Sequence, residues 1–142
     1  MKVYLDNCCY NRPFDDQTDF SVRLEAEAKL YVQELIKEGY IDLVWSSVND
    51  FENNDNPFDE KRERIAAENC TMNDAILQKA VELRRQKLQA KDALHIAAAI
   101  VSKCDYFLTT DNKILNKNIA GIKVVNPVVF PQEYTHEKRH IN

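Results

Sequence analysis

The sequence predicts a three-layer α/β domain with a central, mostly parallel sheet flanked by helices. Two observations support this fold class. Short β-type runs alternate with longer stretches in which apolar residues recur at helical spacing. Turn and capping residues separate these runs, as they do in chains that wind strands and helices around one parallel sheet. The 142 residues are the size of one domain, so we expect a single domain over residues 1–142.

The expected elements follow one another without a linker or a repeat. KVYL (2–5) predicts a strand, and the apolar spacing over 20–38 predicts a helix that Gly39 would terminate. The helices over 57–68 and 73–88 are expected to form a hairpin. The other expected elements are a strand at 41–45, a helix starting within 46–52, a helix at 93–102, a strand at 106–110, a short helix at 112–118, a strand at 122–125 and a partly disordered C-terminal arm at 127–142.

Composition and cysteine spacing narrow the class of protein. Hydrophobic residues make up 44% of the chain and charged residues 30%, which is ordinary for a globular protein. No apolar run approaches the ~20 residues that span a bilayer, so no membrane partner is expected. Cys8 and Cys9 are adjacent and Cys70 and Cys104 are isolated, which suits neither a zinc site nor a disulfide framework. With no signal-peptide pattern in MKVYLDN, we expect a cytoplasmic protein.

Charge is distributed unevenly along the chain, although its net value is only −4. Residues 1–60 carry 5 Lys/Arg and 14 Asp/Glu, a net charge of −9. Residues 61–91 carry 8 and 4, a net charge of +4, and residues 92–142 carry 6 and 5, a net charge of +1. This pattern fits two solvated helix faces. It also fits a basic wall beside an acidic site that acts on phosphates.

Three aspartates are expected at one edge of the predicted sheet. Asp6 follows the first strand, Asp111 follows the strand at 106–110, and Asp92 begins the helix that leads into that strand. Ligands of parallel α/β sheets bind outside the carboxyl ends of the strands. Each aspartate also has an ordinary structural alternative: Asp6 could form an Asx-turn, and Asp92 and Asp111 could be helix N-caps.

Grouped carboxylates favour a particular chemistry. Within a few ångströms they repel one another unless a cation neutralises them. Hard oxygen ligands suit Mg²⁺ or Mn²⁺. These ions support in-line attack of water on a phosphodiester. The sequence therefore predicts a Mg²⁺ or Mn²⁺ site that acts on phosphodiester bonds.

Three motifs resemble those of PIN domains: YLDNCCYNRP near the N-terminus, DALHIAAAI in the second half and FLTTDNKIL after it. PIN domains are metal-dependent ribonucleases, and many bacterial and archaeal members are toxins of toxin–antitoxin pairs. The resemblance covers essentially the whole chain and implies a PIN-like fold and a metal-dependent endoribonuclease, the toxin of a type II toxin–antitoxin pair. The alternative is a catalytically inactive PIN-like module that binds nucleic acid or protein. A phosphoacceptor domain is disfavoured because Cys8 stands where a phosphatase Asp-x-Asp motif needs its second aspartate.

The resemblance implies specific site residues. Asp6, Asp92 and Asp111 would be catalytic acids that bind the metal. The remaining catalytic acid of the family lies on the helix after the second strand, where Glu52 matches best and Asp50 competes. Residues two apart on a helix point about 200° apart, so only one of them can face the site. We choose Glu52 because it lies closer to the apolar face of that helix.

The neighbours of these acids include further candidates. Thr110 resembles the hydroxyl that PIN domains place near the metal, and Asn7 follows Asp6 where relatives often have Thr or Ser. His95 is interpreted as a hydrogen-bonded helix residue, since the metal–water mechanism needs no histidine. The candidates for RNA-phosphate contacts are Arg12, Arg84, Arg85, Lys87 and Lys91.

The resemblance also implies partners. RNA would be the substrate, and in toxin relatives the same groove accepts a segment of the cognate antitoxin. Relatives commonly form dimers, so a homodimer is expected.

Overall fold

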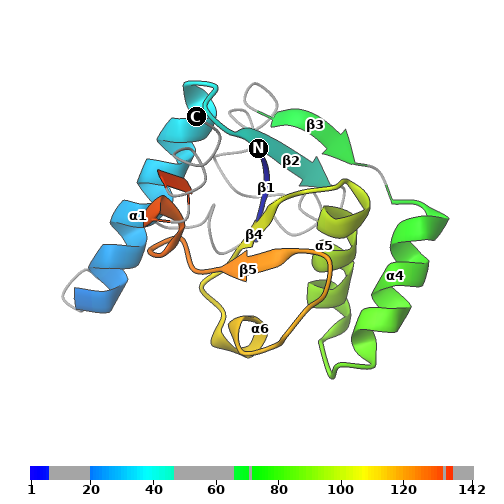
Figure 1. Ribbon diagram of the computed structural model, residues 1–142. Coiled ribbons are helices and arrows are strands. Elements are labelled where there is room, and N and C mark those ends of the chain that lie inside the picture. The colour runs from blue at the N-terminus through cyan, green and yellow to red at the C-terminus, as the bar shows by residue number, and fades with distance from the viewer. Residues whose placement is uncertain (7–19, 47–65, 71, 133, 136–142) are drawn as a thin grey trace, which may run out of the picture.

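The chain folds around one parallel sheet (Figure 1). A computed structural model describes residues 1–6, 20–46, 66–70, 72–132 and 134–135. Its five strands pair in the order β3-β2-β1-β4-β5, and every pairing is parallel. The strands are β1 (Lys2–Leu5), β2 (Asp42–Ser46), β3 (Ala66–Cys70), β4 (Tyr106–Leu108) and β5 (Lys123–Val125), and the helices are α1 (Phe20–Lys37), α4 (Asp74–Arg84), α5 (Ala90–Val101) and α6 (Asn112–Leu115). The α/β class predicted from the sequence is confirmed.

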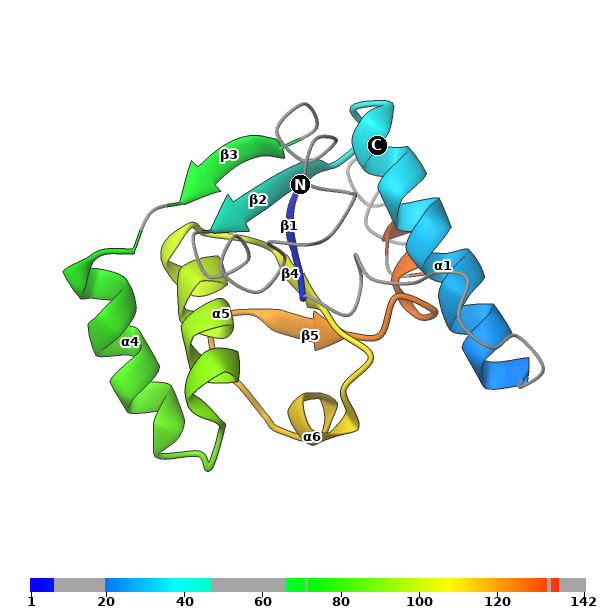
Figure 2. The same cartoon turned by 180° about the vertical axis from the view of Figure 1, so that it is seen from behind.

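Helices cover both faces of the sheet. Figures 1 and 2 show α4 and α5 on one side of the strands and α1 on the other. Successive residues of a strand point to opposite faces. Tyr4 of β1 accordingly belongs to the hydrophobic cluster under α4 and α5, while Val3 and Leu5 belong to the cluster under α1. The layered arrangement follows from this alternation.

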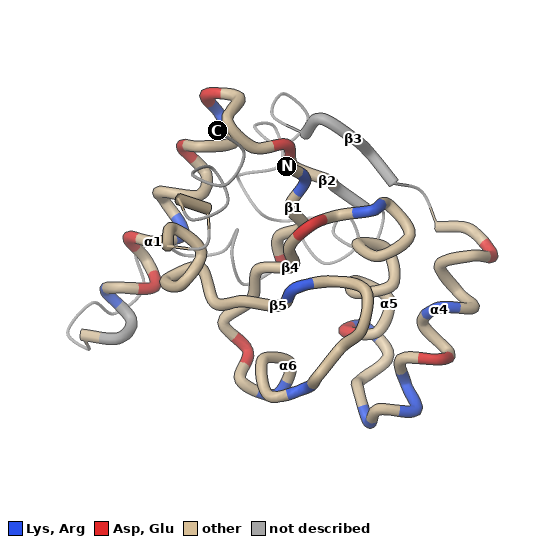
Figure 3. Tube along the Cα trace, viewed as in Figure 1, with Lys and Arg blue, Asp and Glu red and all other residues tan. Residues whose placement is uncertain are grey.

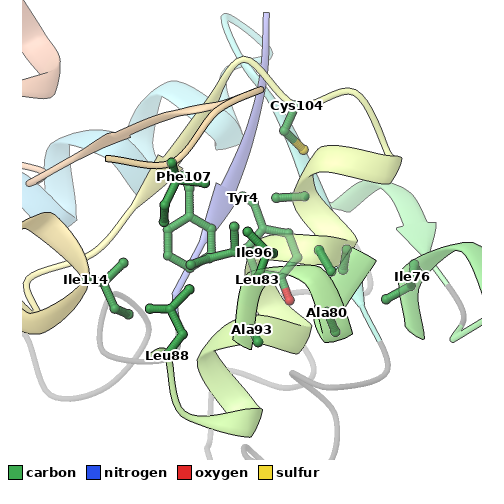
Figure 4. Close-up of a cluster of buried hydrophobic side chains, with 14 of the residues drawn as sticks. Tyr4, Ile76, Ala80, Leu83, Leu88, Ala93, Ile96, Cys104, Phe107 and Ile114 are labelled. Carbon is green, nitrogen blue, oxygen red and sulfur yellow. The ribbon is translucent and has the colours of Figure 1, made fainter. Parts of the chain in front are cut away.

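The cluster beneath α5 is built around aromatic rings and small side chains (Figure 4). The rings of Tyr4 and Phe107 stack with their centroids 5.4 Å apart. Ala93 and Ala97 of α5 are fully buried, and their small side chains let the helix lie close to the strands. Close packing in this layer fixes the position of α5, whose first turn carries Asp92.

The second cluster includes part of the segment after β5. Phe130 is fully buried and Tyr134 is nearly so, and both pack with residues of α1 and the strands. The Phe130 ring meets the edge of the Tyr106 ring at a centroid distance of 5.3 Å. Within the segment predicted to be an arm, Phe130 and Tyr134 therefore contribute to the core.

Most expected elements are present close to their predicted positions. The first two strands, the first helix, and the strands and short helix of the second half all occur, and Gly39 follows α1 with a φ of +84°. The interval predicted at 73–88 is helical only to Arg84. The helix start predicted within 46–52 and most of the helix predicted at 57–68 lie outside the described residues.

Two predictions of local structure are wrong. Residues 66–68 belong to strand β3, which pairs with β2, rather than to the end of a helix. Helix α5 begins at Ala90 with Gln89 as its N-cap, so Asp92 lies inside the first turn and is not the cap. Within the described residues α4 packs against α5, and no helix there is long and apolar enough to cross a membrane.

Candidate functional site

Asp6 and Thr109 lie side by side at the carboxyl ends of the central strand β1 and its neighbour β4. The register of β1 and β4 places Leu5 opposite Leu108, and the pairing continues as Asp6 N donates to Leu108 O at 2.9 Å. Thr109 Oγ1 then donates to Asp6 Oδ2 at 2.7 Å. Asp6 is 8% exposed and Thr109 is fully buried. A charge-assisted hydrogen bond therefore fixes this carboxylate in a mostly dry position.

Asp111 is attached to the same hydroxyl group through its backbone. Asp111 N donates to Thr109 Oγ1 at 3.1 Å, so Thr109 bridges the two aspartates. The side chain of Asp111 caps α6, because its Oδ1 accepts from Lys113 N at 2.9 Å. The capping role considered for Asp111 is thus real, and it holds the residue at the carboxyl edge of the sheet.

Asp92 reaches this edge from the first turn of α5. It is half-buried and lines a cavity together with Lys113 and Lys117, which follow Asp111 in the chain. One turn further along α5, His95 is buried and its Nδ1 lies 2.6 Å from the hydroxyl oxygen of Tyr4. This hydrogen bond ties α5 to β1, and the interpretation of His95 as a hydrogen-bonded helix residue is confirmed.

The structure links two of the predicted acids through Thr109 and places the third at the same edge. Asp6 and Asp111 share Thr109, and Asp92 borders the segment that Asp111 starts. No three Asp, Glu, His or Cys side chains within the described ranges form a group that could hold a metal ion. Glu52, its competitor Asp50, Asn7 and Arg12 lie outside those ranges.

The donor chemistry at this edge fits a hard divalent cation. Asp6, Asp92 and Asp111 offer carboxylate oxygens, the ligands that Mg²⁺ and Mn²⁺ prefer. Hydrogen bonds orient two of these carboxylates, as a ligand set requires. These three carboxylates are therefore the candidates for part of such a set.

Thr109 is a site residue that the sequence did not reveal. The prediction named Thr110, which is half-buried and remains a candidate, whereas the hydroxyl that contacts Asp6 belongs to Thr109. The pairing register explains why Thr109, and not Thr110, contacts Asp6. Leu5 pairs with Leu108, so the residues that follow the two strands, Asp6 and Thr109, are also neighbours. The sequence shows both strands but not their register.

The predicted RNA-binding residues that the structure describes surround the start of α5. Arg84 ends α4, Arg85 is its C-cap, and both are exposed. Lys87 is exposed in the α4–α5 connection and Lys91 in the first turn of α5. Figure 3 shows basic residues along this connection and on α6, at the same end of the molecule. Positive charge therefore adjoins the acidic edge.

Comparison with known proteins identifies a fold relative. No protein-family model matches the chain, and no curated protein matches it. The chain is similar to a solved structure described as a toxin–antitoxin complex from Klebsiella pneumoniae, with a TM-score of 0.57 and 21% sequence identity. The match covers 88% of this chain and 97% of that chain. At this identity, the likeness shows a shared fold.

Proposed function

We propose that the chain is a Mg²⁺- or Mn²⁺-dependent endoribonuclease of the PIN type that hydrolyses RNA phosphodiester bonds. The observation that carries this proposal is the Thr109 bridge between Asp6 and Asp111 at the carboxyl edge of the sheet, with Asp92 on the helix at that edge. An arrangement that orients carboxylates at the ends of parallel strands suits metal-assisted hydrolysis better than a purely structural role.

The residues have distinct roles in this proposal. Asp6, Asp92 and Asp111 would hold the ion, and Glu52 would be the fourth catalytic acid. The bound ion would supply an activated water and stabilise the charge that develops on the phosphate. Thr109 orients Asp6 through its hydrogen bond. Thr110 and Asn7 remain the candidates for further polar contacts beside the ion.

The biological context is part of the proposal. We infer that the chain is the toxin of a toxin–antitoxin pair, acting in the cytoplasm as a homodimer with an antitoxin as its protein partner. The supporting observation is the shared fold with a chain from a toxin–antitoxin complex. Arg12, Arg84, Arg85, Lys87 and Lys91 are the proposed contacts to RNA phosphates.

An RNA cleavage assay tests the enzymatic part of the proposal. Purified protein is incubated with labelled single-stranded RNAs in Mn²⁺, in Mg²⁺ and in EDTA, with Asp92→Asn in parallel. We expect cleavage with either ion and none in EDTA, and a rate at least about 100-fold lower for Asp92→Asn, since losing a ligand should cost at least as much as losing an outer-shell partner.

The result that contradicts the proposal is equally clear. If several classes of RNA stay intact in every metal while the folded protein still binds RNA, the chain is a binding module of the same fold. Cleavage that persists in EDTA would exclude the proposed metal chemistry. Cleavage by Asp92→Asn at the wild-type rate would remove that residue from the active site.

A further inference from the structure

A cavity of about 380 Å³ lies between the α4–α5 connection (residues 85–89) and the α6 segment, which is α6 with the turn that follows it (residues 112–117). Lys87 and Gln89 of the connection line one side of it, and Lys113, Asn116 and Lys117 line the other. Asp92 also lines this cavity, so it adjoins the proposed catalytic edge. Figure 3 shows the basic residues of both segments at the end of the molecule where α5 begins.

The lining of the cavity carries excess positive charge. Three lysines and one aspartate give it a formal charge of +2. In the part of the chain that the structure describes, no ion pair or side-chain hydrogen bond engages the ammonium groups of Lys87, Lys113 or Lys117. Gathered cations repel one another, so this arrangement is favourable when an anion lies among them.

The two lysines of the α6 segment follow Asp111, the N-cap of α6. Lys113 lies in α6, and Lys117 N donates to Ile114 O at 3.0 Å, which continues the helical turn beyond Leu115. Lys113 is also joined to Asp111 through the cap. Of the proposed acids, Asp92 therefore lines the cavity itself, and Asp111 is joined through its cap to a residue that lines it.

Lys87 stands in a backbone conformation that favours glycine. Its φ is 66°, in the left-handed region, and Lys103 is the other residue besides glycine with positive φ among the described residues. A lysine at such a position is strained relative to glycine. Lys87 lines the cavity despite this strain. Lys103, at the opposite end of α5, provides a matched comparison.

We propose that this cavity is a phosphate subsite that holds an RNA phosphate beside the one that is cleaved. The inference rests on the proposed ribonuclease function and adds Lys113, Lys117 and Asn116 to its substrate contacts. Lysine binds phosphate as a compact point charge with three donors, and the Asn116 amide offers a further donor. The subsite would position the strand so that the next phosphate meets Asp92 and the other acids.

RNA binding in EDTA tests the subsite separately from catalysis. The dissociation constant of a labelled single-stranded RNA is measured at several salt concentrations for wild type and for the double variant Lys113→Gln/Lys117→Gln. Each phosphate contact contributes about 0.7 to the salt slope of single-strand binding. We expect the slope to fall by about 1.4 and the affinity to fall roughly 25-fold at about 0.1 M salt.

Lys87→Gly tests the lysine that lines the cavity, and Lys103→Gly is its matched control. Both variants replace a lysine that has a left-handed backbone conformation with glycine, which adopts it without strain. We therefore expect each variant to melt at or above the wild-type temperature. Only Lys87→Gly should weaken RNA binding. Equal RNA affinity in these two variants would overturn the role of Lys87 and show that its position is structural only.

The outcomes separate this inference from the proposed function. Metal-dependent cleavage with unchanged RNA affinity and salt slope in the double variant would overturn the subsite and leave the nuclease intact. Lysine-dependent RNA binding without cleavage in any metal would support the subsite and contradict the nuclease. If wild type binds poly-glutamate but not RNA, and the double variant binds neither, the cavity serves an acidic protein segment and the inference is wrong.

Discussion

At the residue scale, one hydroxyl group organises the proposed site. Thr109 Oγ1 donates to Asp6 and accepts from the backbone of Asp111. Because Asp6 is buried, its carboxylate depends on hydrogen-bond donors to offset the loss of water. Removing this donor should therefore affect stability as well as the orientation of the acid.

Thr109→Val tests this bridge, since valine has a similar shape but no hydroxyl. We expect the free energy of unfolding to fall by about 1–3 kcal/mol, because the buried Asp6 carboxylate loses this donor. RNA cleavage should fall as well. Urea unfolding and the cleavage assay measure the two effects. Thr109→Ser keeps the hydroxyl and should retain most of both, and a valine variant as stable and active as wild type would refute the bridge.

The Tyr4–His95 hydrogen bond gives a second prediction at this scale. Tyr4→Phe removes the hydroxyl that lies 2.6 Å from His95 Nδ1 in the core. We expect a loss of about 1–3 kcal/mol in the free energy of unfolding, since the buried imidazole loses that partner. Tyr31→Phe is the control, because Tyr31 is 44% exposed on α1. Equal urea midpoints for the two variants would argue against this contribution.

The residues of the site were predictable to different degrees. Asp6 and Asp111 could be placed because each directly follows a predicted strand, and parallel strands end at the same edge. Asp92 was placed through the helix that it was expected to cap. The pairing of Asp6 with Thr109 was not predictable, because it depends on the register of strands about 100 residues apart.

At the element scale, β3 shows why local sequence was insufficient. Its residues AAENC include Ala, Glu and Asn, which are depleted in strands, and residues 66–68 fell within the interval predicted as a helix. The segment is a strand because it pairs with β2, a tertiary interaction that overrides the weak local preference. The strands β1 and β2 were predictable because their apolar runs are short and bounded by turn residues.

Helix α4 gives a prediction at this scale. Asn73 is its N-cap, with Oδ1 accepting from Ile76 N at 2.9 Å. Asn73→Ala should lower the free energy of unfolding by about 1 kcal/mol, because the helix loses a capping acceptor. Asn73→Asp keeps an acceptor and should be close to wild type in thermal unfolding. If the alanine and aspartate variants have the same melting temperature, the cap contributes nothing to stability.

At the scale of the whole molecule, two hydrophobic clusters hold the layers together. One places α5 against the sheet, and the other joins α1 to the segment after β5. The site lies where the ends of β1, β4 and α5 meet, so its geometry depends on both clusters. The layers were predictable from strand and helix alternation, but the packing of Phe130 and Tyr134 was not, because their segment shows no periodic pattern.

Phe130→Ala tests the contribution of this last segment. Phe130 is fully buried and packs against Tyr106 of β4. We expect a loss of about 3–5 kcal/mol in the free energy of unfolding, from lost burial and the cavity that remains. Val128→Ala is the control, because Val128 is 37% exposed and should change stability by less than about 0.5 kcal/mol. A similar small effect for both variants would show that Phe130 is not part of the core.

The central claim, that the carboxyl edge of the sheet is a metal-dependent nuclease site, is tested most directly by comparing two aspartates. Asp42 begins β2 at the opposite edge of the sheet and is exposed. The initial rate of single-stranded RNA cleavage in Mn²⁺ is measured for Asp6→Asn and Asp42→Asn, with circular dichroism to check folding. We predict a rate at least about 100-fold lower for Asp6→Asn, and a rate within about twofold of wild type for Asp42→Asn. Equal rates for the two folded variants would contradict the claim.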